Sequence, residues 1–200
     1  MFMNNLFDRI AEHYDSPKQL ELAKAISEKI KTELTNSKSK VVLDYGCGTG
    51  LVGLALADKF EQIVFVDPSK EMINIVDQKI EQMKLTNTQT IVDHFSKGHT
   101  LDLKADVIIL SLVLLHIPDT QEILEALYEV LNPKGCLLVV DFDKNEKVSH
   151  EKVHNGFSQT DLKQKLETIG YKYVQSETFY HGEQLFMKQD ASMFLLRAEK

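Results

Sequence analysis

The stretch that decides the fold is Val41-Val42-Leu43-Asp44-Tyr45-Gly46-Cys47-Gly48-Thr49-Gly50. Its first three residues are aliphatic and suit a strand that is buried on both faces. A helical pattern starts near Leu51. Between the two, the glycines at positions 46, 48 and 50 let the backbone turn tightly and approach a ligand closely, because they carry no Cβ. The alternative is that the three glycines only form a tight turn between a strand and a helix and bind nothing. A second feature of the chain argues against this alternative.

That second feature is Asp67, which directly follows the next apolar run, Ile63 to Val66. It lies roughly 20 residues beyond the glycine loop, the distance at which nucleotide-binding folds place a carboxylate on a ribose. Such a carboxylate accepts hydrogen bonds from the ribose hydroxyls. The two features together predict a site for a ligand that contains a nucleoside.

The glycine pattern alone leaves two ligands open. Residues 48–53 (GTGLVG) match the dinucleotide pattern G-x-G-x-x-G, which would make the protein an NAD(P)-dependent oxidoreductase. Asp44 argues against this, since a carboxylate at the start of the loop repels a pyrophosphate and attracts the sulfonium and ammonium groups of S-adenosylmethionine. No lysine or arginine lies between Val41 and Asp58 to offset that charge. The sequence therefore favours S-adenosylmethionine.

Short apolar runs alternate with helical patterns along the chain. Such runs suit strands of a parallel sheet that helices cover on both faces, and they are Val41–Leu43, Ile63–Val66, Val107–Leu110 and Cys136–Val140. Near the carboxyl end, Tyr171–Thr178 and Ser192–Ala198 read as two strands joined by a polar stretch, an antiparallel pair at the sheet edge. The alternation predicts a Rossmann-like, doubly wound α/β sheet with helices on both faces.

The predicted helices have recognisable ends. Their amino-terminal caps are Ser16 followed by Pro17, Ser69, Asp119 with Glu122 in capping-box spacing, and Ser158 with Asp161. The predicted stops are Met83 for the second of these helices, Pro133 for the third and Gly170 for the fourth. The connection from Phe142 to Phe157 is long and charged, and such loops at the carboxyl ends of strands usually carry substrate contacts.

Composition limits the class of protein. The net charge of −7, from 23 basic and 30 acidic residues, argues against an extended nucleic-acid footprint. The longest apolar run, Val107 to Ile117, is too short to span a membrane, and the first ten residues do not read as a secretory signal. Two cysteines build neither a disulfide framework nor a four-cysteine zinc site, and no metal site is predicted. A cytoplasmic protein is expected; its oligomeric state is open.

Residues 43–50 (LDYGCGTG) resemble motif I of the class I S-adenosylmethionine-dependent methyltransferases, whose usual form is LDxGCGTG. Nearly the whole chain is similar to that family, and residues 7–15 resemble the amino-terminal segment of its quinone- and other small-molecule-methylating branch. The later motifs follow in the family's order; they are Val66-Asp67-Pro68-Ser69 with Met72, Val92-Asp93-His94-Phe95, residues 106–116 (DVIILSLVLLH) and residues 131–135 (LNPKG).

The resemblance implies a seven-stranded sheet with an antiparallel last strand, and S-adenosylmethionine as cofactor with S-adenosylhomocysteine as product. It implies that Asp67 binds the ribose, that Asp93 meets the adenine amino group, and that Tyr14 closes over the cofactor. The full set of implied cofactor-binding residues is Tyr14, Asp44, Gly46, Cys47, Gly48, Gly50, Asp67, Pro68, Ser69, Met72, Asp93, His94, Phe95, Ser111 and Leu112.

Methyl transfer needs a general base only if the acceptor arrives protonated. The candidates are His116, which follows the fourth apolar run, His154 in the long loop, and Tyr14, with His150 as a more distant one. Each has a plain alternative as a capping or solvated residue. Cys47 resembles a nucleophile, but no histidine accompanies it in sequence, so we expect it to pack as a small loop residue.

These observations predict one methyltransferase domain over residues 1–200. Residues 1–36 form its helical lid segment, residues 37–141 the cofactor-binding core, and residues 142–200 the substrate loop, a helix and the terminal hairpin. The expected activity is methyl transfer to a small-molecule acceptor, favoured over nucleic acid because no Asn- or Asp-Pro-Pro-aromatic element follows the fourth run. Besides the oxidoreductase, the alternative is a non-catalytic scaffold that keeps S-adenosylmethionine binding.

Overall fold

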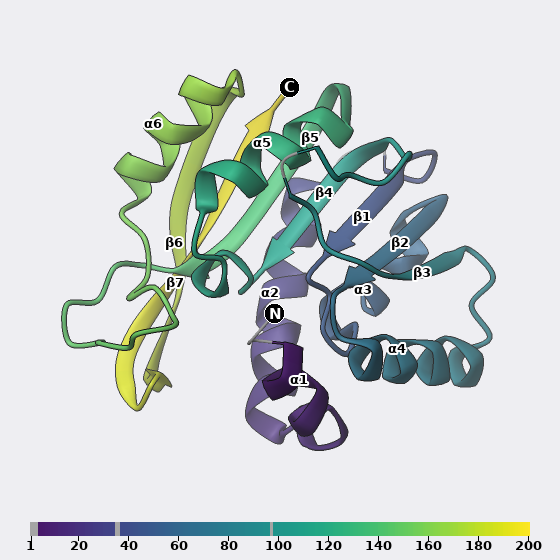
Figure 1. Cartoon of the computed structure of the whole chain (residues 1–200), viewed down its shortest axis with the longest axis horizontal. Helices are drawn as coiled ribbons and strands as arrows, with labels where there is room; N and C mark the ends of the chain where they lie inside the picture. Colours follow the sequence, from purple (N-terminus) through teal and green to yellow (C-terminus); the bar gives the residue numbers. More distant parts are fainter. Residues whose placement is uncertain (1–3, 35–36, 97) are drawn as a thin grey trace. The chain divides into compact units, whose positions relative to one another are not determined.

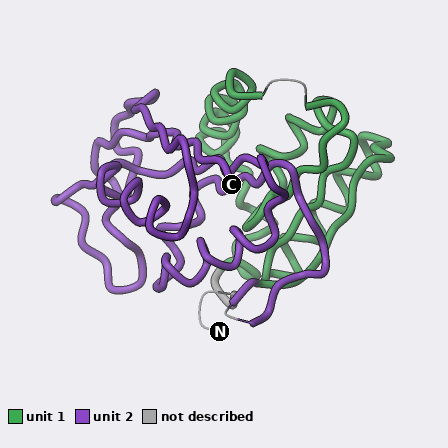
Figure 2. Tube along the Cα trace, turned by 90° about the horizontal axis from the view of Figure 1, so that it is seen from above, with its two compact units in different colours: residues 1–94 green, residues 95–200 purple. Residues whose placement is uncertain are grey.

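The computed structural model describes residues 4–34, 37–96 and 98–200. The chain divides into two compact units, residues 1–94 and residues 95–200 (Figure 2), and each is described by itself below. The strands belong to one seven-stranded mixed sheet in the order β3-β2-β1-β4-β5-β7-β6. The predicted Rossmann-like α/β sheet, including its antiparallel last strand, is confirmed. The predicted division into lid segment, core and substrate part stays a prediction.

The first unit contributes three parallel strands: β1 (Val41–Tyr45), β2 (Gln62–Asp67) and β3 (Thr88–Val92). The first two are buried along most of their length, as their aliphatic sequences predict. The third was not predicted, because its sequence TQTIV is half polar and no residue of it is fully buried.

The helices of this unit are α1 (Asn4–Ile10), η1 (Ala11–His13), α2 (Pro17–Glu33), α3 (Leu51–Leu54), η2 (Ala57–Lys59) and α4 (Lys70–Met83), labelled in Figure 1 where there is room. Those that begin at Pro17, Leu51 and Lys70 start where the sequence predicts. The Ser16 side chain accepts a hydrogen bond from the Gln19 backbone N–H, and the Ser69 side chain accepts one from that of Met72. The predicted helix near Leu51 is only one turn long.

The second unit holds β4 (Ala105–Ser111), β5 (Leu131–Phe142), β6 (Lys172–Phe186) and β7 (Gln189–Glu199). β4 and β5 are parallel, while β7 runs antiparallel to both β5 and β6. Its helices are η3 (Leu114–His116), α5 (Thr120–Val130) and α6 (Gln159–Ile169). The predicted caps of α5 and α6 are confirmed, since Asp119 accepts from Gln121 and Glu122, and Ser158 accepts from Asp161.

Two predicted boundaries in this unit were wrong. The α5 helix ends at Val130 rather than near Pro133, and residues 131–135 already belong to β5. The polar stretch between the terminal strands is not a loop, because β6 continues to Phe186 and turns at Met187 and Lys188. Both turn residues have positive φ (49° and 64°), a conformation that suits a two-residue hairpin turn but that neither residue type signals.

A buried carboxylate, Asp141, lies near the end of β5 and is 0% exposed. One of its oxygens accepts a hydrogen bond from the Phe142 backbone N–H (2.8 Å) and the other accepts one from that of Leu115 (3.2 Å), in η3. Burial raises the pKa of Asp141 to about 7, against the lowering effect of these backbone N–H groups. Asp141 therefore fixes the segment that follows β4 to the end of β5.

This raised pKa predicts a pH-dependent stability. Because folding favours the protonated form of Asp141, its contribution is full below the unfolded-state pKa near 4 and is lost as pH rises through about 7. We expect the free energy of unfolding of the wild type, relative to Asp141→Asn, to fall by about 2–3 kcal/mol from pH 5 to pH 8. Urea unfolding of both proteins at each pH measures this, and other titrating groups cancel in the comparison. A pH-independent difference would contradict it.

Candidate functional site

The glycine loop is attached to the end of β2. The backbone N–H groups of Gly46 and Cys47 both donate to the carbonyl of Val66, at 2.7 and 3.1 Å. Gly46, Gly48 and Gly50 have φ values of 69°, 54° and 78°, which glycine adopts without strain. The loop therefore takes the shape that its three glycines predict, directly between β1 and α3.

Asp67 connects this loop to the segment after β2. Its Oδ2 accepts a hydrogen bond from the Gly48 N–H (2.9 Å), and its Oδ1 accepts one from the Ser69 N–H (2.8 Å). The side chain is buried, and burial raises its pKa. Each oxygen keeps a further lone pair, so the carboxylate can still accept hydrogen bonds from a pair of ligand hydroxyls.

The residues after Asp67 form the start of α4. The Ser69 hydroxyl donates to Asp8 of α1 at 2.5 Å, and Met72 is 1% exposed, so its side chain belongs to the core of this unit. Pro68, between Asp67 and Ser69, is half-buried. Beyond β3, the Asp93 N–H donates to the carbonyl of Asp67 at 3.2 Å. Asp93 therefore lies beside the residue that is predicted to bind the ribose. The neighbouring His94 side chain is largely exposed.

Asp44 is buried in β1, beside Gly53 of α3. It is 2% exposed, and a Cβ on Gly53 would lie 2.3 Å from its Oδ2. Among the described residues this oxygen has no hydrogen-bond partner. Burial raises the pKa of Asp44 to about 7, against the hydrogen bond from the Gly53 backbone, and the nearby Asp67 raises it further. A cation near this carboxylate would therefore stabilise its charged form.

Cys47 has the properties of a packed loop residue. Its thiol donates to the Gly48 carbonyl (3.6 Å), and its pKa is raised well above the usual range by burial and by the carboxylates of Asp44 and Asp67. A thiol in this setting stays protonated. The role of Cys47 as a packed loop residue stays a prediction.

Tyr14 lies over the glycine loop. A Cβ on Gly48 would lie 4.0 Å from Cε1 of the Tyr14 ring. Burial raises the pKa of Tyr14, and the nearby Asp67 and Asp15 raise it further. The phenol therefore stays protonated, which suits a covering aromatic better than a general base.

Lys79 of α4 is a residue that the sequence did not single out. Its Nζ forms an ion pair with Asp15 (2.6 Å to Oδ2) and donates to the carbonyl of Thr49 (2.7 Å). The Thr49 hydroxyl in turn donates to the other oxygen of Asp15 at 2.5 Å. A cation thus does lie at the glycine loop, contributed by a helix that begins some 20 residues after it. Its charge is paired with Asp15.

The remaining predicted residues lie in the second unit. Phe95 is buried and belongs to the core. Ser111 and Leu112 are half-buried at the end of β4, where the Leu112 N–H donates to the Val140 carbonyl. Leu112 has a φ of 56°, an uncommon conformation for an aliphatic residue. Strain of this kind often marks a site where the backbone contacts a ligand.

His116 ends η3, directly after this strained turn. Its pKa is lowered to about 4 by burial, with a further contribution from the charge of His150 in the long loop. The imidazole is therefore neutral above about pH 5. A neutral imidazole can accept a proton, although a pKa this low makes it a weak base.

His154 holds the long loop to the segment after β4. Its backbone N–H donates to the Leu115 carbonyl and its ring Nε2 lies 2.9 Å from the Ile117 carbonyl. Because a carbonyl only accepts, Nε2 carries the proton, and Nδ1 alone remains for proton transfer. These contacts give His154 a structural role within the loop.

The residues around the glycine loop fit S-adenosylmethionine. The carboxylate oxygens of Asp67 keep lone pairs that suit the hydroxyls of a ribose. The positive φ of Gly48, which carries no Cβ, lets a ligand approach the loop backbone closely. The Asp44 oxygen that has no hydrogen-bond partner among the described residues favours a nearby cation. A dinucleotide fits less well, because the carboxylate of Asp44 at the start of the loop would repel its pyrophosphate.

Known proteins of similar sequence are methyltransferases. The chain is 27% identical over 147 residues to a demethylmenaquinone methyltransferase of Lactobacillus johnsonii, an alignment that covers 70% of the chain and 60% of that protein. It is 24% identical over 156 residues to a tRNA 5-carboxymethoxyuridine methyltransferase of Escherichia coli O157:H7, with 76% and 59% covered. The chain thus matches less than two thirds of the length of these relatives.

Among solved structures, a SAM-dependent methyltransferase from Aquifex aeolicus has the same fold. The TM-score is 0.72 at 21% identity, with 96% of the chain and 97% of that protein covered. The family described as "Methyltransferase domain" matches residues 36–189, well over half of the chain. The protein therefore belongs to the methyltransferase-domain family, and the resemblance of its motifs to class I S-adenosylmethionine-dependent methyltransferases is confirmed.

Proposed function

We propose that this protein transfers the methyl group of S-adenosylmethionine to a small-molecule acceptor by in-line displacement. The observation that carries the proposal is the carboxylate of Asp67, which hydrogen-bonds the glycine loop at Gly48 and keeps lone pairs for a ribose. S-adenosylmethionine supplies an already activated methyl carbon when bound. The tasks left to the protein are to bind, to orient the acceptor and to exclude water.

The described residues divide these tasks. Asp67 and Gly48 position the nucleoside, and Tyr14 covers the loop and excludes water from it. Asp44, buried in β1, provides negative charge that favours a cationic ligand. In the second unit, the turn at Leu112 and the imidazole of His116 are the groups proposed to face the acceptor, with His116 accepting a proton where the acceptor carries one.

A small acceptor agrees best with the charge of the chain. A net charge of −7 disfavours a long phosphate backbone, because phosphate contacts supply most of the affinity for nucleic acid. One relative is named for a quinone precursor and another for a tRNA, so both acceptor classes occur among similar proteins. Within residues 4–34, 37–96 and 98–200, no helix is long and apolar enough to cross a bilayer.

The cofactor assignment predicts a calorimetric result. S-adenosylhomocysteine should bind, NAD should not, and Asp67→Ala should weaken the binding by about 1–3 kcal/mol, the scale of lost hydrogen bonds to a charged group. Asp58→Ala is the matched control, since Asp58 is an exposed carboxylate that forms an ion pair with its neighbour Lys59. Binding of NAD alone would mean an oxidoreductase. If Asp67→Ala binds as tightly as the wild type, Asp67 is not in the site.

The proposed base predicts a separation of binding from turnover. His116→Ala should lower kcat by about 10²- to 10⁴-fold for an acceptor that must lose a proton, and leave the affinity for S-adenosylhomocysteine unchanged. Because the His116 imidazole is neutral above about pH 5, its protonation should not lower the kcat of the wild type between pH 6 and pH 8.

A methyl-release assay over a panel of phenols, hydroquinones, amines and tRNA measures this and identifies the acceptor class. Full turnover of His116→Ala would end its assignment as base. Methylation of tRNA alone would overturn the small-molecule acceptor. Binding without turnover of any acceptor would favour the scaffold alternative.

A further inference from the structure

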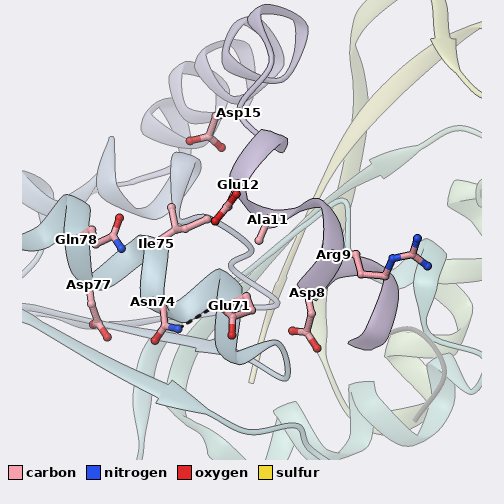
Figure 3. Close-up of a pocket in the computed structure, with 10 residues that line it drawn as sticks. All are labelled: Asp8, Arg9, Ala11, Glu12, Asp15, Glu71, Asn74, Ile75, Asp77 and Gln78. Atoms are coloured by element: carbon pink, nitrogen blue, oxygen red, sulfur yellow. Dashed lines mark hydrogen bonds between the residues drawn. The ribbon is translucent and has the colours of Figure 1, made fainter.

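The amino-terminal segment, residues 8–15, and α4 face each other across an acidic cavity. Figure 3 shows Asp8, Arg9 and Glu12 on one side and Glu71 and Asp77 of α4 on the other. The cavity has a volume of about 630 Å³, and the described residues that line it include five carboxylates and one guanidinium. Like charges repel one another, so the carboxylates of the segment and of α4 oppose close approach of the two. Contacts between the segment and α4 counter this repulsion.

The Ser69 hydroxyl provides one such contact, to Asp8. Lys79 provides another, to Asp15. Its ammonium lies 2.6 Å from Asp15 and 2.7 Å from the carbonyl of Thr49, so it joins the segment and the glycine loop to α4 at one point. The Thr49 hydroxyl donates to Asp15, so Lys79, Asp15 and Thr49 all contact one another. All three groups are half-buried or buried, and the side chains of Lys79 and Asp15 are 23% and 29% exposed. Partial burial reduces the screening of such a pair by salt.

We infer that Lys79 is a positioning residue for cofactor binding. It acts through Asp15, which directly follows Tyr14, and so keeps the Tyr14 ring over Gly48. The inference rests on the proposed function, because the ligand that Tyr14 covers is the cofactor. Lys79 itself touches the loop only at the Thr49 carbonyl and is no catalytic residue.

Three variants test this inference. Lys79→Met keeps the length of the side chain but removes the charge, and it should raise the Kd for S-adenosylhomocysteine about five- to tenfold, through faster dissociation. Lys79→Arg keeps the charge and should stay within about threefold of the wild type. Lys31→Met is the matched control, since Lys31 pairs with Glu28 on α2 at 2.8 Å and should change nothing. Melting temperatures confirm that each variant folds.

A double-mutant cycle separates positioning from a general effect on stability. If Lys79 acts through Asp15, the variant Asp15→Asn/Lys79→Met binds no more than about twofold more weakly than Lys79→Met alone. If the losses of affinity in Asp15→Asn and Lys79→Met add up in the double variant, the inference is wrong. It is also wrong if the wild type binds S-adenosylhomocysteine and Lys79→Met binds it equally tightly.

Hydrogen exchange without ligand decides the inference independently of the cofactor. The amides of Tyr14 and Ser16 donate to the carbonyls of Ala11 and Tyr14, and both should exchange at least fivefold faster in Lys79→Met than in Lys31→Met. If the wild type does not bind S-adenosylhomocysteine at all, the proposed function fails, and this measurement still shows whether Lys79 orders the segment. Equal exchange in the two variants would contradict the inference.

Discussion

The hydrogen bonds between the glycine loop and the end of β2 are the constraint on which the rest of the site depends. Gly46 and Cys47 donate to the Val66 carbonyl, and Gly48 donates to the carboxylate of Asp67. These bonds give the loop the positive φ angles that only glycine takes easily, and they place the loop beside the residue that is proposed to bind the ribose. The carboxylate that shapes the loop is thus the same one that is proposed to bind the ribose.

Buried carboxylates recur at the ends of the central strands. Asp44, Asp67 and Asp141 lie near the ends of β1, β2 and β5, and burial raises the pKa of each. Burying a carboxylate destabilises a fold unless hydrogen bonds compensate, and each of these accepts bonds from the backbone. Asp141 holds the segment after β4, and Asp67 holds the glycine loop. Backbone hydrogen bonds accepted by Asp67 and Asp141 thus order the irregular segments that carry the proposed site.

Local features were predictable where one residue determines one contact. The caps at Ser16, Ser69, Asp119 and Ser158 were all confirmed, since each depends on a side chain three residues or fewer from its partner. The glycine loop and the fold class were predictable because the motif combines a strand, a turn and a helix in a short stretch. The length of β6 and β7 was missed, because their strand pairing depends on the partner strand rather than on the polar residues of the turn region.

Contacts between distant segments could not be predicted from the pattern. Lys79 lies 30 residues from Thr49 and still contacts the glycine loop, although the stretch from Val41 to Asp58 contains no lysine or arginine. The same holds for His154, whose partner carbonyl at Ile117 lies 37 residues away and fixes its tautomer. The roles of the individual site residues stay predictions, because each depends on where a ligand lies.

The most direct test of the central claim is the backbone amide spectrum of the protein, recorded by NMR as S-adenosylhomocysteine is added. If the glycine loop and Asp67 form the cofactor site, the largest shifts occur at Gly48, at the rest of residues 46–50 and at Ser69, while the amides of β6 move little. Shifts confined to other parts of the chain, with Gly48 unchanged at saturating ligand, would contradict the account.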